Sequence, residues 1–173
     1  MALLWSQVLI LICCVTSSNS EIIHIDADAP YMKFINIESK TSELIWIKGR
    51  QDAAIGLFQF SNTSSMVYEF IIGGWSNTLA AIRYKQHYPN PLEFTKHEPD
   101  LLLNPHQFMP FWVEWTSNNV CIKPGTVGSN GQAMQSTRFN DTTPIRYISF
   151  RTGMKYALKF AYDLSCKKPN ISL

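Results

Sequence analysis

The sequence predicts an all-β fold, an antiparallel β-sandwich of jelly-roll-like type with about ten short strands. Three observations support this. Short runs rich in β-branched and aromatic residues recur along the chain, turn-forming residues separate them, and helical periodicity is almost absent. The chain contains 10 Phe, 7 Tyr and 5 Trp, and only 16% of its residues are charged. Because disordered chains are poor in aromatic residues and rich in charge, this composition indicates a packed domain.

The expected strands follow one another at the spacing of a sandwich, with turns such as Gly73-Gly74 between them. In chain order they are residues 22–25, 33–37, 44–48, 53–60, 66–72, 78–84, 108–116, 120–123, 145–151 and 156–164. Asn118-Asn119 is expected to form a hairpin turn, and residues 125–131 a loop. Four prolines interrupt residues 86–105, so long regular elements are not expected there.

The N-terminus has the pattern of a secretory signal peptide. An apolar run over residues 3–15 is too short to cross a bilayer comfortably, and small polar residues follow it. Ser18 and Ser20 occupy the −3 and −1 positions for cleavage after Ser20. We therefore expect residues 1–20 to be removed, and the alternative is an uncleaved membrane anchor. Residues 21–173 would then form one secreted, extracellular domain without a membrane span.

The cysteines and sequons agree with export. Cys13 and Cys14 lie in the leader, so Cys121 and Cys166 remain and are expected to pair. Their disulfide would contribute about 4 kcal/mol in the chain-entropy model, whereas two buried free thiols are the alternative. Three sequons lie in polar stretches, and at least one is expected to carry a glycan. Their asparagines are Asn62, Asn140 and Asn170.

Several short strings carry a resemblance to a known family. The most specific is YEFIIGGWSNT, residues 68–78, and Ile82-Arg83 follows it. FWVEW at residues 111–115, PIRYI at residues 144–148 and Thr152-Gly153 continue the match. Together they resemble the farnesoic acid O-methyltransferase domain family, in the form of a secreted single-domain member of arthropod type. The resemblance covers most of the chain after the leader.

The resemblance implies methyl transfer from S-adenosylmethionine to farnesoic acid, on the route to juvenile-hormone-like molecules. The residues themselves do not favour this chemistry. A Rossmann-type methyltransferase places a glycine-rich turn between a parallel strand and a helix. Here Gly73-Gly74 leads into Trp75 and another strand pattern, and residues 125–131 have glycines without a following helix. We therefore expect no cofactor, and methyltransferase activity stays an alternative.

The Gly73-Gly74 corner is the strongest candidate for a ligand site. Trp75 offers a flat apolar face, while Asn77 and Arg83 offer directed hydrogen bonds. This pairing suits a sugar ring, which has apolar faces and a rim of hydroxyl groups. The alternative is a structural corner in which Trp75 is buried and Arg83 pairs with Glu69.

The aromatic strand at residues 111–115 supplies further candidates. Alternation places Phe111, Val113 and Trp115 on one face and Trp112 and Glu114 on the other. One face must belong to the core. Trp112 is then either covered by a loop or exposed on a binding surface. We include Trp112 and Glu114, together with Glu69, among the candidate ligand-binding residues.

Two other chemistries have little support. Glu69 and Glu114 would serve a glycosidase only if their carboxyl groups lay about 5–10 Å apart in a cleft. His24, Asp26 and Asp28 would share one face of an extended strand, but such a face is more often simply solvated than a metal site. We assign neither catalytic nor metal-binding residues.

These observations predict a secreted, non-catalytic recognition module that binds a glycan or another extracellular surface component. The alternatives are the family's methyltransferase activity and an extracellular carrier of a terpenoid or lipid. The net charge is only +2, with Lys and Arg scattered along the chain, so nucleic acid is not an expected partner.

Overall fold

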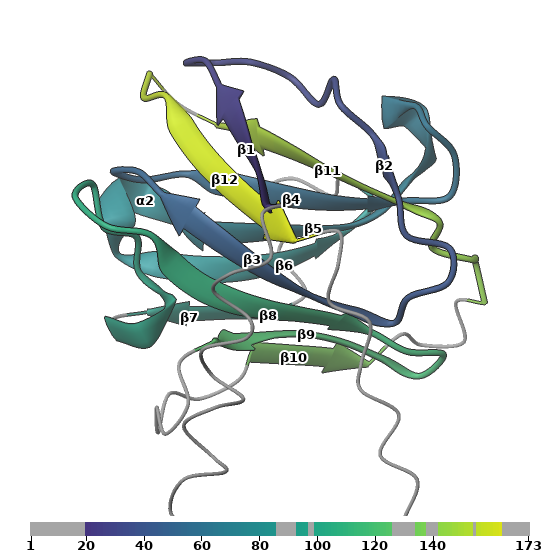
Figure 1. The fold of residues 1–173 in the computed structure, drawn as a ribbon. Helices are drawn as coiled ribbons and strands as arrows, with labels where there is room; N and C mark the ends of the chain where they lie inside the picture. The colour runs from purple at the N-terminus through teal and green to yellow at the C-terminus, as the bar shows by residue number, and fades with distance from the viewer. Residues whose placement is uncertain are drawn as a thin grey trace, which may run out of the picture.

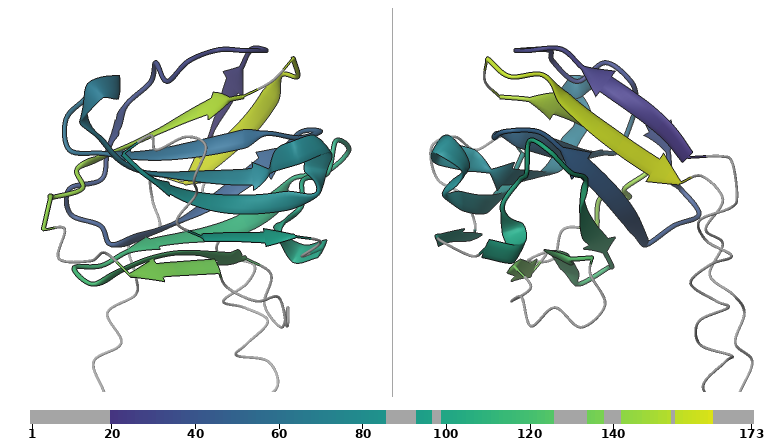
Figure 2. Two further views of the ribbon diagram at one scale, coloured as in Figure 1. Left: turned by 180° about the vertical axis from the view of Figure 1, so that it is seen from behind. Right: turned by 60° about the vertical axis from the view of Figure 1, so that its left-hand side comes forward.

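The protein is a sandwich of two antiparallel β-sheets packed face to face (Figures 1 and 2). The computed structural model describes residues 20–85, 93–96, 99–125, 134–137, 142–153 and 155–163. Within these residues each sheet contains six strands. No helix in this part of the chain is long and apolar enough to cross a membrane.

The two sheets, here called sheet A and sheet B, draw their strands from the whole length of the chain. Sheet A runs in the order β1 (Ser20–Ile25), β12 (Leu158–Asp163), β3 (Ser42–Lys48), β8 (Met109–Trp115), β9 (Asn119–Pro124) and β10 (Met134–Thr137). Sheet B runs in the order β2 (Ile35–Asn36), β11 (Tyr147–Thr152), β4 (Ala53–Phe58), β5 (Met66–Gly73), β6 (Leu79–Tyr84) and β7 (Glu93–Lys96). The short turns are η1 (Thr63–Ser65), α2 (Gly74–Asn77) and η2 (Pro99–Leu101).

The core lies between the sheets, and period-two alternation supplies it. In β8, Phe111, Val113 and Trp115 point inward, as the alternation in the sequence predicts. Phe150 of sheet B stacks on Phe160 of sheet A, with ring centroids 4.6 Å apart. At the far edge β7 and β10 lie against each other, which closes that side of the sandwich (Figure 1).

The outer face of sheet B is also covered, and this feature positions the candidate site. Every residue of β4 and β5 is buried, whereas β3 of sheet A alternates between buried and accessible positions. The segment at residues 26–34, here called the covering segment, connects β1 to β2. It places Tyr31 and Phe34 against a second apolar cluster that includes Ala54, Phe58 and Ile71.

The sequence-based fold class is confirmed, with corrections in detail. Twelve strands are present in the described residues, against about ten expected. In agreement with the expectation that residues 86–105 lack long regular elements, the described part of this stretch contains only the four-residue strand β7 and the three-residue turn η2. The strand β10 was not predicted, and Asn119 begins β9 rather than belonging to a turn. Short polar strands such as β10 lack the apolar alternation that identifies a strand in sequence.

Candidate functional site

A left-handed turn at the end of β5 forms the centre of the candidate site. Gly73 has φ +64°, and Trp75, Ser76 and Asn77 follow with φ of 50°, 63° and 61°. For residues with a side chain this region costs about 1–2 kcal/mol each. Three such residues within α2 therefore store strain that the surrounding structure must offset.

Asn77 fastens this turn to the segment that follows η2. Its side-chain amide donates to the carbonyl of Leu103 at 3.0 Å and accepts from the backbone N–H of Leu103 at 2.9 Å. The glycine at position 73 is required as well. A Cβ there would lie 2.5 Å from the Asn77 Oδ1 and 2.9 Å from the Leu103 Cγ, so a side chain would displace the fastening.

Trp75 projects from this turn and is 48% exposed. Its backbone carbonyl accepts a hydrogen bond from the Thr78 hydroxyl at 2.7 Å, which further restrains the turn. The guanidinium carbon of Arg83 lies 5.7 Å from the centroid of the Trp75 ring, within the range of a cation–π contact. The Trp75 ring thus stays accessible to solvent, while the Thr78 hydrogen bond restrains its backbone and Arg83 contacts the ring.

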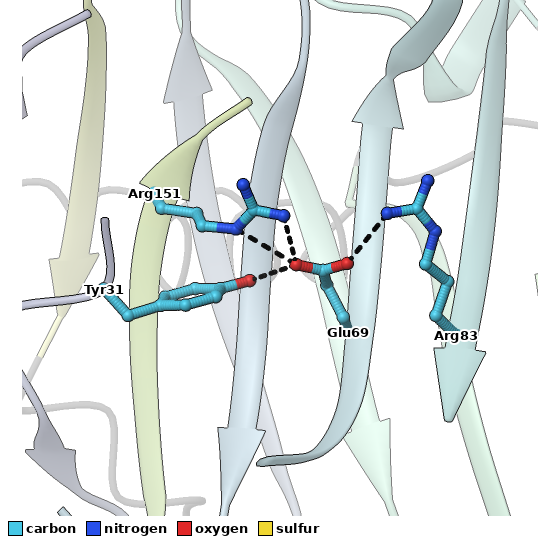
Figure 3. A network of polar contacts seen from close by, with 4 residues as sticks. All are labelled: Tyr31, Glu69, Arg83 and Arg151. Atoms are coloured by element: carbon cyan, nitrogen blue, oxygen red, sulfur yellow. Dashed lines mark hydrogen bonds and ion pairs between the residues drawn. The ribbon is translucent and has the colours of Figure 1, made fainter. Parts of the chain in front are cut away.

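Glu69 connects Arg83 to a second arginine, Arg151, on the outer face of sheet B (Figure 3). Its Oε2 accepts from the Nη1 of Arg83 at 3.1 Å. Its Oε1 accepts from the Nη2 of Arg151 at 2.6 Å and from the Nε at 3.1 Å. The register brings them together, because Glu69 pairs with Arg83 across β5 and β6, while Arg151 comes from β11 on the other side of β4. The Glu69 side chain is only 3% exposed.

Tyr31 completes this network from the covering segment. Its hydroxyl donates to the Oε1 of Glu69 at 2.9 Å, and its ring lies 5.2 Å from the guanidinium carbon of Arg151 (Figure 3). A Cβ on Gly56 would come within 3.1 Å of the Tyr31 ring, so this glycine leaves room for the aromatic side chain. Burial and the adjacent Glu69 carboxylate raise the pKa of the Tyr31 hydroxyl well above its ordinary value.

Asp52 joins the site from the residue before β4. Its side chain accepts from the Nε2 of Gln51 at 2.7 Å and from the backbone of Trp75. Burial raises the pKa of the Asp52 carboxyl, although these hydrogen bonds and the charge of Arg83 oppose the shift. The site therefore combines two arginines and two carboxyl groups with one exposed tryptophan, whose ring contacts Arg83 and whose backbone contacts Asp52.

The structure separates the remaining sequence-based candidates from this site. Trp112 and Glu114 lie on the outer face of sheet A, where Glu114 pairs with Lys123 at 2.6 Å. Glu69 lies on the outer face of sheet B, so the whole sandwich separates the two glutamates. The acid/base pair considered for a glycosidase is therefore wrong.

The Gly-Gly corner combines both interpretations that the sequence left open. Arg83 pairs with Glu69, as the structural interpretation expected. Trp75 is exposed rather than buried in the core, as the functional interpretation expected. Asn77 uses its amide to restrain the turn instead of presenting it to a ligand, so its role is positional.

The structure describes only some of the residues in the disulfide and glycosylation predictions. Cys121 is buried and forms no disulfide among them, and Cys166 lies outside them. Burial and the nearby Glu114 carboxylate raise the pKa of the Cys121 thiol. Asn62 is exposed and caps η1 from the preceding position, where its side chain accepts from the Ser65 backbone N–H at 3.0 Å. The other two sequon asparagines, Asn140 and Asn170, lie outside the described residues.

Three site residues were not predicted from the sequence: Tyr31, Asp52 and Arg151. Tyr31 lies 38 residues from Glu69 in sequence, and no local pattern links the two. Arg151 carries a weak signal, because Ser149 and Arg151 are polar positions at alternate places in an otherwise apolar strand. Such alternation shows that they share a face but does not identify their partners.

This arrangement favours binding by shape and polar contact. A half-exposed indole ring offers an apolar platform, and Arg151, whose side chain is 28% exposed, offers charged donors at the far end of the Glu69 network. Both are restrained before any ligand arrives, which lowers the entropy cost of binding.

Comparison with known proteins agrees with this architecture. Residues 26–166 match the profile of the family described as farnesoic acid O-methyl transferase. No curated protein sequence matches the chain.

The solved structures that share the fold include galectins. Chicken galectin 2 superposes with a TM-score of 0.51 at 13% identity, over 75% of this chain and 99% of that chain. Sheep galectin-11, solved in complex with glycerol, gives a TM-score of 0.50 at 9% identity, over 75% of this chain and 94% of that chain. At such identities the likeness establishes the galectin-like fold alone.

Proposed function

Because the chain belongs to the farnesoic acid O-methyltransferase family and has a galectin-like sandwich, we propose that it is a secreted, non-catalytic module that binds a glycan or another extracellular surface component. One observation carries this proposal above the others. Trp75 is held half exposed on a strained turn, directly beside a network of buried ion pairs.

The strain supports a binding role. A left-handed turn of three residues with side chains is costly, and such strain collects at functional sites. A glycine at the exposed Ser76 position would relieve part of that cost without removing a described side-chain contact. What the turn provides is the fixed presentation of Trp75, and the fold alone does not need an exposed indole ring.

The chemistry of the site favours a sugar. An indole face stacks on the apolar face of a sugar ring, and guanidinium donors at its edge reach hydroxyl groups. The name galectin denotes a lectin, so the fold shared with chicken galectin 2 is one in which carbohydrate binding occurs. This supports a glycan as the ligand class.

The test is a neutral-glycan array probed with the full chain secreted from a eukaryotic host, alongside two variants. Trp75→Ala removes the platform, and Trp46→Ala is the matched control, because Trp46 is 40% exposed on the opposite sheet. We expect selective binding by the parent protein, retained in Trp46→Ala and lost in Trp75→Ala. A blank array, or equal loss in both variants, would contradict the proposal.

Methyltransferase activity has a separate test. Every strand pair in the described residues is antiparallel, and Gly73-Gly74 leads into a left-handed turn. These residues do not fit the strand–turn–helix cradle that a Rossmann-type site uses for S-adenosylmethionine. A rise in the melting temperature with millimolar S-adenosylmethionine or S-adenosylhomocysteine would favour the enzyme.

A terpenoid carrier would need an apolar cavity. In the described part of the sandwich, large side chains such as Phe111 and Phe160 occupy the space between the sheets and are completely buried. Displacement of a fluorescent lipid by farnesoic acid would favour the carrier over the proposed module.

A further inference from the structure

A row of basic side chains crosses the outer face of sheet A, on the opposite side of the molecule from Trp75. His24 of β1 is directly opposite Lys159 of β12, and Lys159 is directly opposite Lys48 of β3. All three belong to the outward set, because the residues on either side of each of them in its strand, such as Ile23 and Ile47, are buried in the core. The right-hand view of Figure 2 shows β1 and β12 side by side on this face.

No acidic side chain is paired with this row. Among the residues that the structure describes, the side chains of Lys48, Lys159 and His24 form neither an ion pair nor a hydrogen bond. Like charges directly opposite each other on neighbouring strands are destabilising. The placement of Lys48 against Lys159 is therefore unfavourable for the fold alone, and an anion bound across both would relieve it.

An apolar row runs parallel to the basic one. Ile22, Ala161, Trp46 and Pro110 lie opposite one another across β1, β12, β3 and β8. Ile22 is 50% exposed and Trp46 is 40% exposed. The two rows are two residues apart along each strand, which is about 7 Å.

A second accessible aromatic ring, that of Tyr156, contacts Arg50 just beyond the end of β3. Arg50 follows Lys48 by two residues and lies 5.0 Å from the centroid of the Tyr156 ring, which is 36% exposed. The face thus presents basic side chains in a line with the accessible ring of Trp46 beside them, and the Tyr156 ring lies in the loop before β12.

The geometry points to a linear sulfated polysaccharide as the ligand of this face. We propose that its sulfate groups lie along His24, Lys159 and Lys48 while a sugar ring rests on Trp46. Neighbouring strands are about 4.8 Å apart, so the three basic side chains span about 10 Å, a length comparable to a disaccharide unit. This site is distinct from the neutral-glycan site of the proposed function, and each can fail without the other.

An anionic bilayer is the competing polyanion, and the geometry favours it less. The exposed apolar groups project from the pleated surface of a sheet rather than from a protruding loop. They cannot enter a membrane unless the whole face enters with them. The flat row of cations instead suits a chain that lies across the strands.

The test compares dextran sulfate with dextran, which share a backbone and differ in the sulfate groups. Binding to the full chain is measured at several salt concentrations. We expect dextran sulfate to bind and dextran not to bind. Each cation that meets a sulfate adds about one to the slope of log affinity against log salt.

Matched variants assign the binding to this face. Lys48→Gln with Lys159→Gln removes two charges from the row and is expected to weaken binding at least tenfold. Lys85→Gln with Arg146→Gln removes two charges elsewhere and is expected to leave binding within twofold. Asp26, which is exposed and follows His24 by two residues, opposes the anion, so Asp26→Asn is expected to strengthen binding.

Folding is monitored in every variant. The Lys48 and Lys159 double variant is expected to melt no lower than the parent, because it relieves the like-charge contact. Equal weakening in the two double variants would overturn the proposal. So would binding to vesicles of 30% phosphatidylserine in phosphatidylcholine without binding to dextran sulfate, since this would assign the face to a membrane.

Discussion

Replacing Glu69 with glutamine is expected to cost far more stability than the size of the change suggests. Gln keeps the shape of the side chain but removes the negative charge that Arg83 and Arg151 share. It also turns one acceptor into an N–H donor that faces the guanidinium donors. The two arginines would then be left without a counter-charge within the described network.

The magnitude follows from the exposure of the groups. The Glu69 side chain is 3% exposed, Arg83 is 11% exposed and Arg151 is 28% exposed. Removing one partner of a buried ion pair costs about 3–5 kcal/mol. Because water reaches part of Arg151, we expect the lower end, about 3 kcal/mol. For a domain of this size the melting temperature would fall by about 6–12 °C.

The assay is thermal and urea unfolding of the parent protein, Glu69→Gln and a control. Glu114→Gln is the matched control, because Glu114 also pairs across neighbouring strands, but its side chain is 36% exposed. An exposed pair contributes at most about 1 kcal/mol, so the control should lower the melting temperature by no more than about 4 °C. Equal losses in the two variants would refute the reasoning.

Three further outcomes are expected from the same site. Ser76→Gly should raise the melting temperature by about 1–3 °C, because glycine adopts the left-handed conformation without strain, and a decrease would show that the turn is not strained. Gly73→Ala should lower the free energy of unfolding by about 2 kcal/mol or more, since it combines a positive φ with close contacts to Asn77 and Leu103, and unchanged urea unfolding would contradict this. Tyr31→Phe should flatten the alkaline loss of stability. With its pKa raised by folding, the Tyr31 hydroxyl contributes stability that is complete below the ordinary tyrosine pKa of about 10 and is lost as pH rises through the folded-state value. Identical urea midpoints against pH in the parent and Tyr31→Phe would contradict it.

Most of the fold could be predicted from the alternation of apolar and polar residues along the strands. In β8, the sequence alone separates Phe111, Val113 and Trp115 from Trp112 and Glu114, because side chains of a strand alternate between faces. It does not say which sheet a strand joins. The sequence therefore does not exclude a contact between Glu69 and Glu114, and only the topology places them on opposite outer faces of the sandwich.

The candidate site was predictable where its residues are neighbours in sequence. The Gly73-Gly74 break indicated an unusual backbone, and the structure shows a left-handed turn there. Tyr31 and Arg151 reach Glu69 from distant segments, so no local pattern could join them. Asn77 was misjudged because an exposed amide and a turn-fastening amide look the same in sequence.

The most direct test of the recognition site follows the indole N–H signals of the tryptophans in a nitrogen-15 NMR titration. The four described tryptophans report different regions. Trp75 lies at the site, Trp46 and Trp112 lie on sheet A, and Trp115 donates to the Lys40 carbonyl at 3.1 Å. When the strongest neutral glycan from the array is added, the Trp75 signal should shift and the other three should stay. Shifts confined to Trp46 and Trp112, with Trp75 unchanged, would contradict the assignment of glycan recognition to the turn after β5.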